Sequence, residues 1–128
     1  ALPDERRALA LPLGCAALVR QVYLLCGDRP LVFARSVMPP GSLRGPNGRL
    51  ARLGSRPLAV LLFGPVPAAR GAIEVAPVGP GQALFEAAGR GLECAPAAPL
   101  WARRSIFYPR GKPVLVTEVF LPGVAELP

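Results

Sequence analysis

Two strand-turn-strand patterns limit the folds that this sequence can adopt. The first runs from Leu18 to Cys26 (LVRQVYLLC), turns at residues 27–30 (GDRP) and continues from Leu31 to Met38 (LVFARSVM). Both arms are rich in aliphatic and β-branched residues, and a Gly-Asp turn between such arms is typical of a β-hairpin. We therefore expect these two segments to pair in antiparallel fashion.

A second hairpin is predicted near the C-terminus. Ser105 to Tyr108 precede a Pro-Arg-Gly-Lys turn, and the apolar run from Val114 to Leu121 follows it. Pro113 is tolerable there because proline is accepted at the first position of a strand. A further strand is expected from Ala72 to Ala76.

The connections between these strands carry helical signals. Arg49 to Phe63 (RLARLGSRPLAVLLF) has leucines at helical spacing split by a glycine, which predicts two short helices, the second capped by Ser55. Another short helix is expected from Gln82 to Ala88, inside the Pro/Gly/Ala-rich stretch from Pro77 to Pro99, which we expect to be a mobile excursion. Two hairpins with helices in their connections indicate an α+β fold, an antiparallel β-sheet with flanking short helices.

Length and hydropathy limit the classes of protein to which this chain can belong. A chain of 128 residues is about one domain, and 17 Pro and 14 Gly make it rich in loops. No uncharged apolar run approaches the roughly 18 to 20 residues that a membrane span requires, because Arg20, Asp28 and Arg29 interrupt the first apolar region. We therefore expect no membrane protein, and the N-terminus is a poor fit to a secretory signal.

The absence of histidine excludes several kinds of site. Ser/His and Cys/His catalysis and most zinc sites need this residue type. The three cysteines, Cys15, Cys26 and Cys94, are an odd number without CxxC spacing. Free thiols in a reducing cytosol are therefore favoured over a disulfide framework or a metal site.

The net charge of +7 favours an anionic partner, which could be nucleic acid, a membrane surface or a small polyanionic substrate. All but one of the 15 basic residues are Arg, and they are scattered singly except at Arg6-Arg7 and Arg103-Arg104. Few aromatic residues accompany them, so a platform for stacking bases is not favoured. Ordinary solvated surface explains most of these charges.

Two charged residues stand inside apolar strands. In the last strand Val114, Val116, Glu118 and Phe120 share one face, and in the first strand Arg20 lies among aliphatic neighbours. An uncompensated buried charge costs several kcal/mol, so each needs a partner or a ligand. Either the two residues pair with each other, or each lies at a wet sheet edge, or they bind a ligand.

Arg35 adds a third charge, in the neighbouring strand. With a two-residue hairpin loop it falls on the same face as Arg20, and with a three-residue loop it does not. We treat it as a supporting residue.

A further anion contact is predictable at the helix expected from Ser55 to Phe63. The first backbone N–H groups of a helix lack intrahelical acceptors and lie at its positive end. Leu58 occupies that first turn, so its amide could hold a carboxylate while its side chain closes an apolar pocket. The alternative is a capped helix that packs Leu58 into the core.

Three blocks of the sequence resemble the chorismate pyruvate-lyase family. They are LVRQVYLLCGDRPLVFARSVMP, LARLGSRPLAVLLF and LWARRSIFYPRGKPVLVTEVFLP, in the order of the family and over most of residues 18–122. The resemblance implies an α+β fold with an antiparallel sheet, a cytoplasmic enzyme without a cofactor, and the elimination of pyruvate from chorismate. The product would be 4-hydroxybenzoate for ubiquinone biosynthesis.

The resemblance also implies site residues. The substrate-binding Arg, Leu and Glu of the family match Arg20, Leu58 and Glu118. Arg20 would grip the ring carboxylate through a charge-assisted fork, with the Leu58 amide as a second donor. Glu118 would hydrogen-bond the ring hydroxyl and is the candidate for proton transfer.

The chain departs from the family in two respects. Family members carry a further, largely helical N-terminal segment that contributes a pocket wall, and residues 1–128 show no match to it. The segment 77–99 is longer than in the family and is interpreted as an insertion. We expect one chorismate lyase-like domain, a shortened chain or a more open pocket, and weaker retention of product.

Two functions remain to be separated. The favoured one is a monomeric enzyme whose partners are chorismate and 4-hydroxybenzoate, with no nucleic acid, membrane or metal. The alternative is a non-catalytic domain that senses an aromatic carboxylate, because the effector-binding domains of one group of bacterial transcription regulators resemble this fold. The chain has no helix-turn-helix pattern and retains all three site positions, which favours the enzyme.

Overall fold

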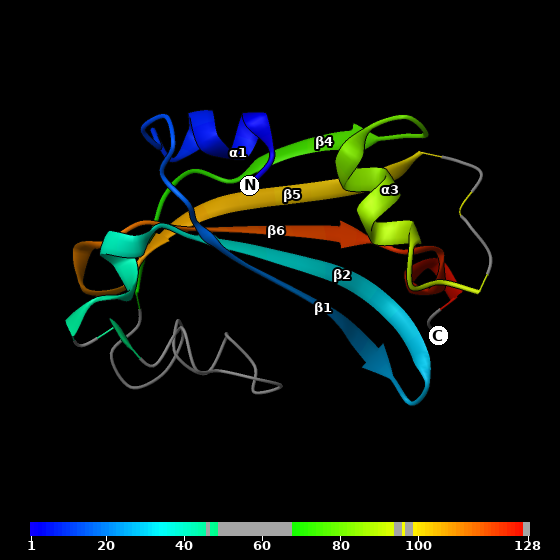
Figure 1. Cartoon of the computed structure of the whole chain (residues 1–128). Helices are drawn as coiled ribbons and strands as arrows, with labels where there is room; N and C mark the ends of the chain where they lie inside the picture. The colour runs from blue at the N-terminus through cyan, green and yellow to red at the C-terminus, as the bar shows by residue number, and fades with distance from the viewer. Residues whose placement is uncertain (46, 49–67, 94–95, 97–98, 127–128) are drawn as a thin grey trace. The chain divides into compact units, whose positions relative to one another are not determined.

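The computed structural model describes residues 1–45, 47–48, 68–93, 96 and 99–126. Figure 1 shows the strands and the helices α1 and α3. The regular elements, in chain order, are α1 (Pro3–Ala8), β1 (Leu18–Cys26), β2 (Arg29–Met38), β3 (Ala69–Arg70), β4 (Glu74–Val78), α3 (Ala83–Gly89), β5 (Leu100–Tyr108) and β6 (Val114–Phe120). Short 3-10 helices cover Pro40–Leu43, Pro109–Gly111 and Pro122–Glu126.

The strands form a six-stranded sheet in the order β1-β2-β6-β5-β3, with β4 also paired to β5. The pairing of β5 with β3 and β4 is antiparallel, and it sets Arg70 opposite Phe107 and Val75 opposite Arg103. An antiparallel sheet with short helices confirms the predicted α+β class. In the part of the chain that is described, no helix has the length and apolar character needed to cross a bilayer.

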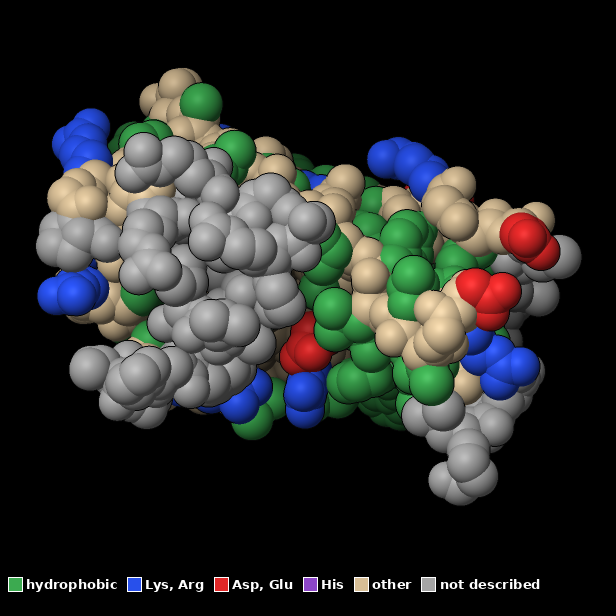
Figure 2. All heavy atoms as spheres, turned by 90° about the horizontal axis from the view of Figure 1, so that it is seen from below, with side chains coloured by type: hydrophobic (Ala, Val, Ile, Leu, Met, Phe, Trp, Pro, Cys, Tyr) green, Lys and Arg blue, Asp and Glu red, His purple; other side chains and the backbone are tan. Residues whose placement is uncertain are grey.

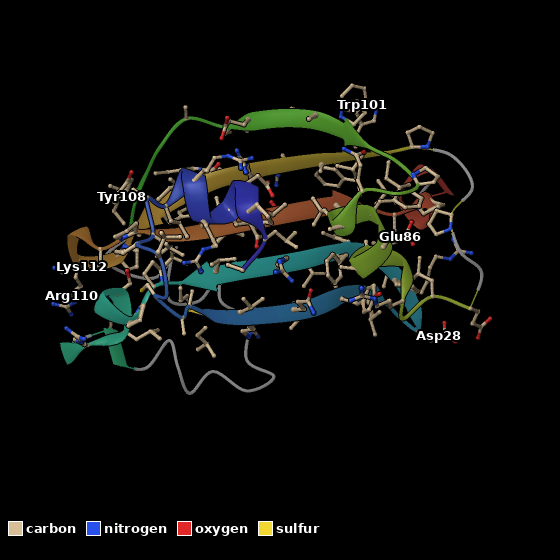
Figure 3. All side chains as sticks on the ribbon, turned by 45° about the horizontal axis from the view of Figure 1, so that its top comes forward. Asp28, Glu86, Trp101, Tyr108, Arg110 and Lys112 are labelled. Carbon is tan, nitrogen blue, oxygen red and sulfur yellow. The ribbon has the colours of Figure 1, made fainter. Side chains whose placement is uncertain are left out.

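Both predicted hairpins are present. β1 has the predicted bounds, and β2 begins at Arg29 instead of Leu31, which leaves Gly27 and Asp28 between the strands. Gly27 has a φ of 62°, a backbone conformation that glycine adopts without steric cost. In the second hairpin the turn holds the exposed residues Arg110 and Lys112 (Figure 3).

Other bounds differ from the prediction. β5 begins at Leu100 instead of Ser105, and the strand expected from Ala72 to Ala76 lies at Glu74–Val78. β4 accommodates Pro77 because a strand with one paired neighbour does not need every N–H in a ladder. The two helices expected between Arg49 and Phe63 lie outside the described residues.

Helix α1 was not predicted, although the sequence carries its signals. Pro3 occupies the first turn, acidic Asp4 and Glu5 lie at the N-terminal end, and basic residues lie in the last turn. The backbone N–H of Leu2 donates to Oε1 of Glu5 at 2.7 Å, which satisfies a donor at the helix start. Charge order and the position of proline could have located this helix.

The chain divides into two compact units, which are described separately. Unit 1 comprises Ala1–Arg20, Ser36–Ala72 and Ser105–Val116. Two side-chain hydrogen bonds brace its turns, from Ser42 Oγ to the Pro113 carbonyl at 2.6 Å and from Asn47 Nδ2 to the Pro109 carbonyl at 2.8 Å. Its described core is Met38, Phe107 and Val114, packed against Leu43, Ala68 and Val116.

Unit 2 comprises Gln21–Arg35, Ile73–Arg104 and Thr117–Pro128. Helix α3 lies across one face of its strands (Figure 1). The buried residues that form this core are Phe33, Val78, Phe85, Ala88, Leu100, Ala102, Val119 and Leu121. Three of them come from residues 77–99, so this packing differs from the expectation of a mobile excursion: apolar side chains spaced along α3 anchor the segment to the sheet.

Tyr23 links β1 to the end of α3 within unit 2. Its hydroxyl donates to the Ala88 carbonyl at 2.6 Å and accepts the backbone N–H of Gly91 at 3.0 Å. Its ring packs against Phe33 with the centroids 5.3 Å apart. The hydroxyl therefore satisfies backbone groups where a helix end leaves carbonyls without intrahelical partners.

Candidate active site

Glu118 lies in β6, where strand alternation separates it from the core. Its neighbour Val119 is 0% exposed and belongs to the core of unit 2. The side chain of Glu118 points to the opposite face, where it is 24% exposed. Toward the end of β6, Glu118 and Phe120 are only partly buried, so an acid is tolerated there within the apolar run.

The carboxylate of Glu118 is held by Arg103 from the neighbouring strand β5. Arg103 Nε donates to Glu118 Oε1 at 2.8 Å, and the arginine side chain is 42% exposed. The guanidinium carbon also lies 5.4 Å from the centroid of the Phe120 ring, within the range of a cation–π contact. A partner inside unit 2 therefore compensates the charge of Glu118, and no other partner is needed to explain it.

The face of unit 2 that carries Glu118 is less covered than the face under α3. We call it the Glu118 face, and it comprises Val75, Trp101, Arg103, Glu118 and Phe120. Trp101 projects from the start of β5 and is 60% exposed (Figure 3). In the coloured part of Figure 2, hydrophobic side chains lie side by side, and acidic side chains lie next to basic ones.

Such an arrangement suits an organic ligand that is both apolar and polar. Apolar and aromatic side chains supply contact area, and a few charged groups fix orientation. A carboxylate held through one oxygen can accept a hydrogen bond from a ligand hydroxyl with the other, or exchange a proton with it.

Arg20 lies in β1 and belongs to unit 1. Its side chain is partly buried, and the Nε atom is shielded from solvent. A guanidinium in this setting is suited to a carboxylate, because its planar fork matches the geometry of two oxygen acceptors.

Arg35 is buried in unit 2, with 9% exposure, and its Nη1 donates to Gln21 Oε1 at 2.6 Å. Gln21 follows Arg20 in β1, so strand alternation directs the two side chains to opposite faces. The loop between the strands has two residues, the case in which we expected Arg35 on the face of Arg20, and the described contact of Arg35 is with Gln21, the residue next to Arg20. A one-residue offset in pairing flips the face of a strand residue, so loop length alone is an insufficient guide.

Leu58 and the capping residue Ser55 lie outside the described residues. The amide contact predicted for Leu58 therefore stays a prediction. Among the residues that are described, no group of three or more His, Cys, Asp or Glu side chains could hold a metal ion, and Cys15 and Cys26 are free thiols.

Arg103 is the described partner of Glu118, and the sequence patterns did not predict this contact. The sequence places it in the pair Arg103-Arg104, among charges that ordinary solvated surface mostly explains, and before the strand expected from Ser105. A signal was present: in the run Leu100 to Ser105 (LWARRS), alternation places Trp101 and Arg103 on one face and Leu100 and Ala102 on the other.

The chain is similar to known proteins both in fold and in sequence. A solved structure of the ligand-binding domain of a protein assigned to the GntR family of transcriptional regulators, from Bordetella bronchiseptica, superposes with a TM-score of 0.64. It is 22% identical and covers 95% of this chain and 77% of that one, so the likeness shows a shared fold.

Sequence relatives are much more similar. A protein of Azoarcus sp. (strain BH72) named "Probable chorismate pyruvate-lyase" is 45% identical over 129 residues, 98% of this chain and 68% of the relative. A protein of the same name from Nitrosomonas europaea is 42% identical over 124 residues, 97% of this chain and 69% of the relative. The profile of the family described as chorismate lyase matches residues 1–126, and the chain therefore belongs to the chorismate lyase family.

Proposed function

We propose that this protein is a chorismate pyruvate-lyase, which converts chorismate into 4-hydroxybenzoate and pyruvate for ubiquinone biosynthesis. The observation that carries the proposal is the family match over residues 1–126, supported by relatives of 41–46% identity that bear this name. The fold is the one that the family resemblance implies.

The reaction balances without a co-reactant. The ether bond between the ring and the enolpyruvyl group breaks, and its electron pair leaves with the ether oxygen. The ring carbon that bears the hydroxyl loses its proton, and the C–H electrons complete the aromatic ring. The released enolate takes up one proton at its methylene carbon and becomes pyruvate. Aromatisation drives the reaction, so the protein mainly orients the substrate and stabilises the developing charge.

We assign roles to three residues on the basis of the family pattern. Arg20 binds the ring carboxylate, with the Leu58 amide as a second donor. Glu118 accepts a hydrogen bond from the ring hydroxyl and gives general acid/base or electrostatic support. Arg35, held by Gln21, is proposed only as a supporting positive charge.

The direct test is incubation of the protein with chorismate while the absorbance of 4-hydroxybenzoate and the amount of pyruvate are followed. We expect the two products in equal amounts. Arg20→Ala should raise KM roughly tenfold to a hundredfold, because a charge-assisted hydrogen bond contributes about 1.5 to 3 kcal/mol. An unchanged KM would contradict the contact assigned to Arg20.

The same experiment separates the enzyme from the sensing domain. Saturable binding of chorismate or 4-hydroxybenzoate without product formation would contradict the lyase and favour a non-catalytic sensor of aromatic carboxylates. A cytoplasmic location and a monomeric state are further proposals from the family resemblance, and size-exclusion chromatography with light scattering would measure the second.

A further inference from the structure

Glu118 has one fixed oxygen and one available oxygen. Arg103 Nε donates to Oε1 at 2.8 Å, while no hydrogen bond among the described residues uses Oε2. A carboxylate without this contact could rotate about its last side-chain torsion, which has a broad energy minimum. The contact to Oε1 therefore selects the orientation in which Oε2 is presented.

Arg103 is itself held in place from the same strand as Glu118. Its guanidinium carbon lies 5.4 Å from the ring centroid of Phe120, which is two residues after Glu118 and so lies on the same face of β6. A planar guanidinium can hydrogen-bond in its plane while its flat side contacts a ring, which a lysine ammonium cannot do. Strand β5 supplies the arginine, and β6 supplies both of its contacts.

We propose that Arg103 is a positioning residue for the lyase reaction: it fixes Glu118 Oε1 so that Oε2 faces the ring hydroxyl of the substrate. This role rests on the proposed function, since it has meaning only if Glu118 takes part in turnover. Arg103 acts through Glu118 and is not assigned a contact with the substrate.

The next residue in the chain supplies a matched control. Arg104 points to the opposite face of β5, and its Nε donates to Glu74 Oε1 at 3.0 Å. Both arginines therefore make a cross-strand pair through Nε to a glutamate. Only the pair of Arg103 includes a residue that the family pattern assigns to the site.

The experiment measures kcat and KM for chorismate in Arg103→Gln, Arg103→Lys and Arg104→Gln. We expect Arg103→Gln to lower kcat by roughly tenfold to a hundredfold with a smaller change in KM, because misplacement of a reacting group by about 1 Å can cost on the order of a hundredfold. Arg103→Lys keeps the charge and should recover part of the loss. The kcat and KM of Arg104→Gln should stay within about twofold of the values of the unsubstituted protein.

A double-substitution cycle tests whether Arg103 acts through Glu118. In the Glu118→Gln background, adding Arg103→Gln should lower kcat further by less than about twofold, because residues that act as a unit are not additive. If Arg103→Gln lowered kcat by the same factor in the unsubstituted protein and in Glu118→Gln, the positioning role would be overturned. Thermal unfolding of each variant, expected to match that of Arg104→Gln within a few degrees, excludes misfolding as the cause.

The outcomes distinguish this inference from the proposed function. If the unsubstituted protein forms 4-hydroxybenzoate and Arg103→Gln equals it in kcat, only the role of Arg103 is overturned. If the unsubstituted protein binds chorismate and forms no product, the proposed function is overturned and the role of Arg103 falls with it.

Discussion

The two faces of the sheet in unit 2 are built from the same strands but differ in how deeply their side chains are buried. Under α3, Val119 and Phe85 are 0% and 4% exposed, in a cluster of hydrophobic side chains that includes the ring of Tyr23. On the Glu118 face, an ion pair and the exposed Trp101 replace this packing. Apolar burial is therefore greater on the face under α3, while each face also carries one arginine–glutamate pair between strands, Arg103–Glu118 on one and Arg104–Glu74 on the other.

The strongest test of this comparison removes one large aromatic side chain from each face. Phe85→Ala should reduce the free energy of unfolding by about 3 to 5 kcal/mol, because it deletes buried apolar area and leaves a cavity. Trp101→Ala should cost less than about 1 kcal/mol, because the side chain is already mostly in water. Urea unfolding followed by circular dichroism measures both, and equal losses would contradict the division between the faces.

A smaller loss of stability is expected from a substitution at Gly91, where the chain passes Tyr23 after α3. A Cβ added at Gly91 would lie 2.6 Å from Tyr23 Cε2, closer than two carbon atoms tolerate. Gly91→Ala should therefore cost roughly 1 to 3 kcal/mol through displacement of the ring. Gly41 is the matched control, since its added Cβ meets nothing within 4 Å. If Gly41→Ala lost as much as Gly91→Ala, the close approach to Tyr23 would not be the cause.

The smallest loss of stability is expected from removal of the Tyr23 hydroxyl. Tyr23→Phe removes the bonds to Ala88 and Gly91 and keeps the ring contact with Phe33, so it should cost about 1 kcal/mol. Tyr108→Phe, at an exposed position in β5, should change stability by less than about 0.5 kcal/mol. Hydrogen exchange of the Gly91 amide, faster in Tyr23→Phe alone, would locate the effect at the end of α3.

Local sequence patterns predicted the strands that pair within hairpins. β1 and β6 follow from dense aliphatic runs beside turn residues, and the acid in β6 could be identified as an anomaly of burial. Helix α3 was expected within one residue of its bounds because its apolar residues have helical spacing.

Features that depend on pairing between distant segments were not predictable in this way. The start of β5 at Leu100 depends on pairing with β4 and β6 on either side of it. The contact of Arg103 with Glu118 depends on the same pairing, so it was not predicted either. The face of Arg35 depends on register, which a one-residue offset inverts. The assignments of Arg20 and Leu58 came from the family resemblance, since burial alone could not separate a ligand contact from ordinary packing.

The role proposed for Glu118 is tested most directly by the kcat of Glu118→Gln for chorismate. Glutamine keeps the shape and can still accept the hydrogen bond from Arg103, so the free energy of unfolding should change by less than about 1 kcal/mol. We expect kcat to fall on the order of a hundredfold or more, while Glu74→Gln, at the exposed pair on the other face, leaves it unchanged. Turnover of chorismate by Glu118→Gln at the rate of the unsubstituted protein would contradict the role of this carboxylate.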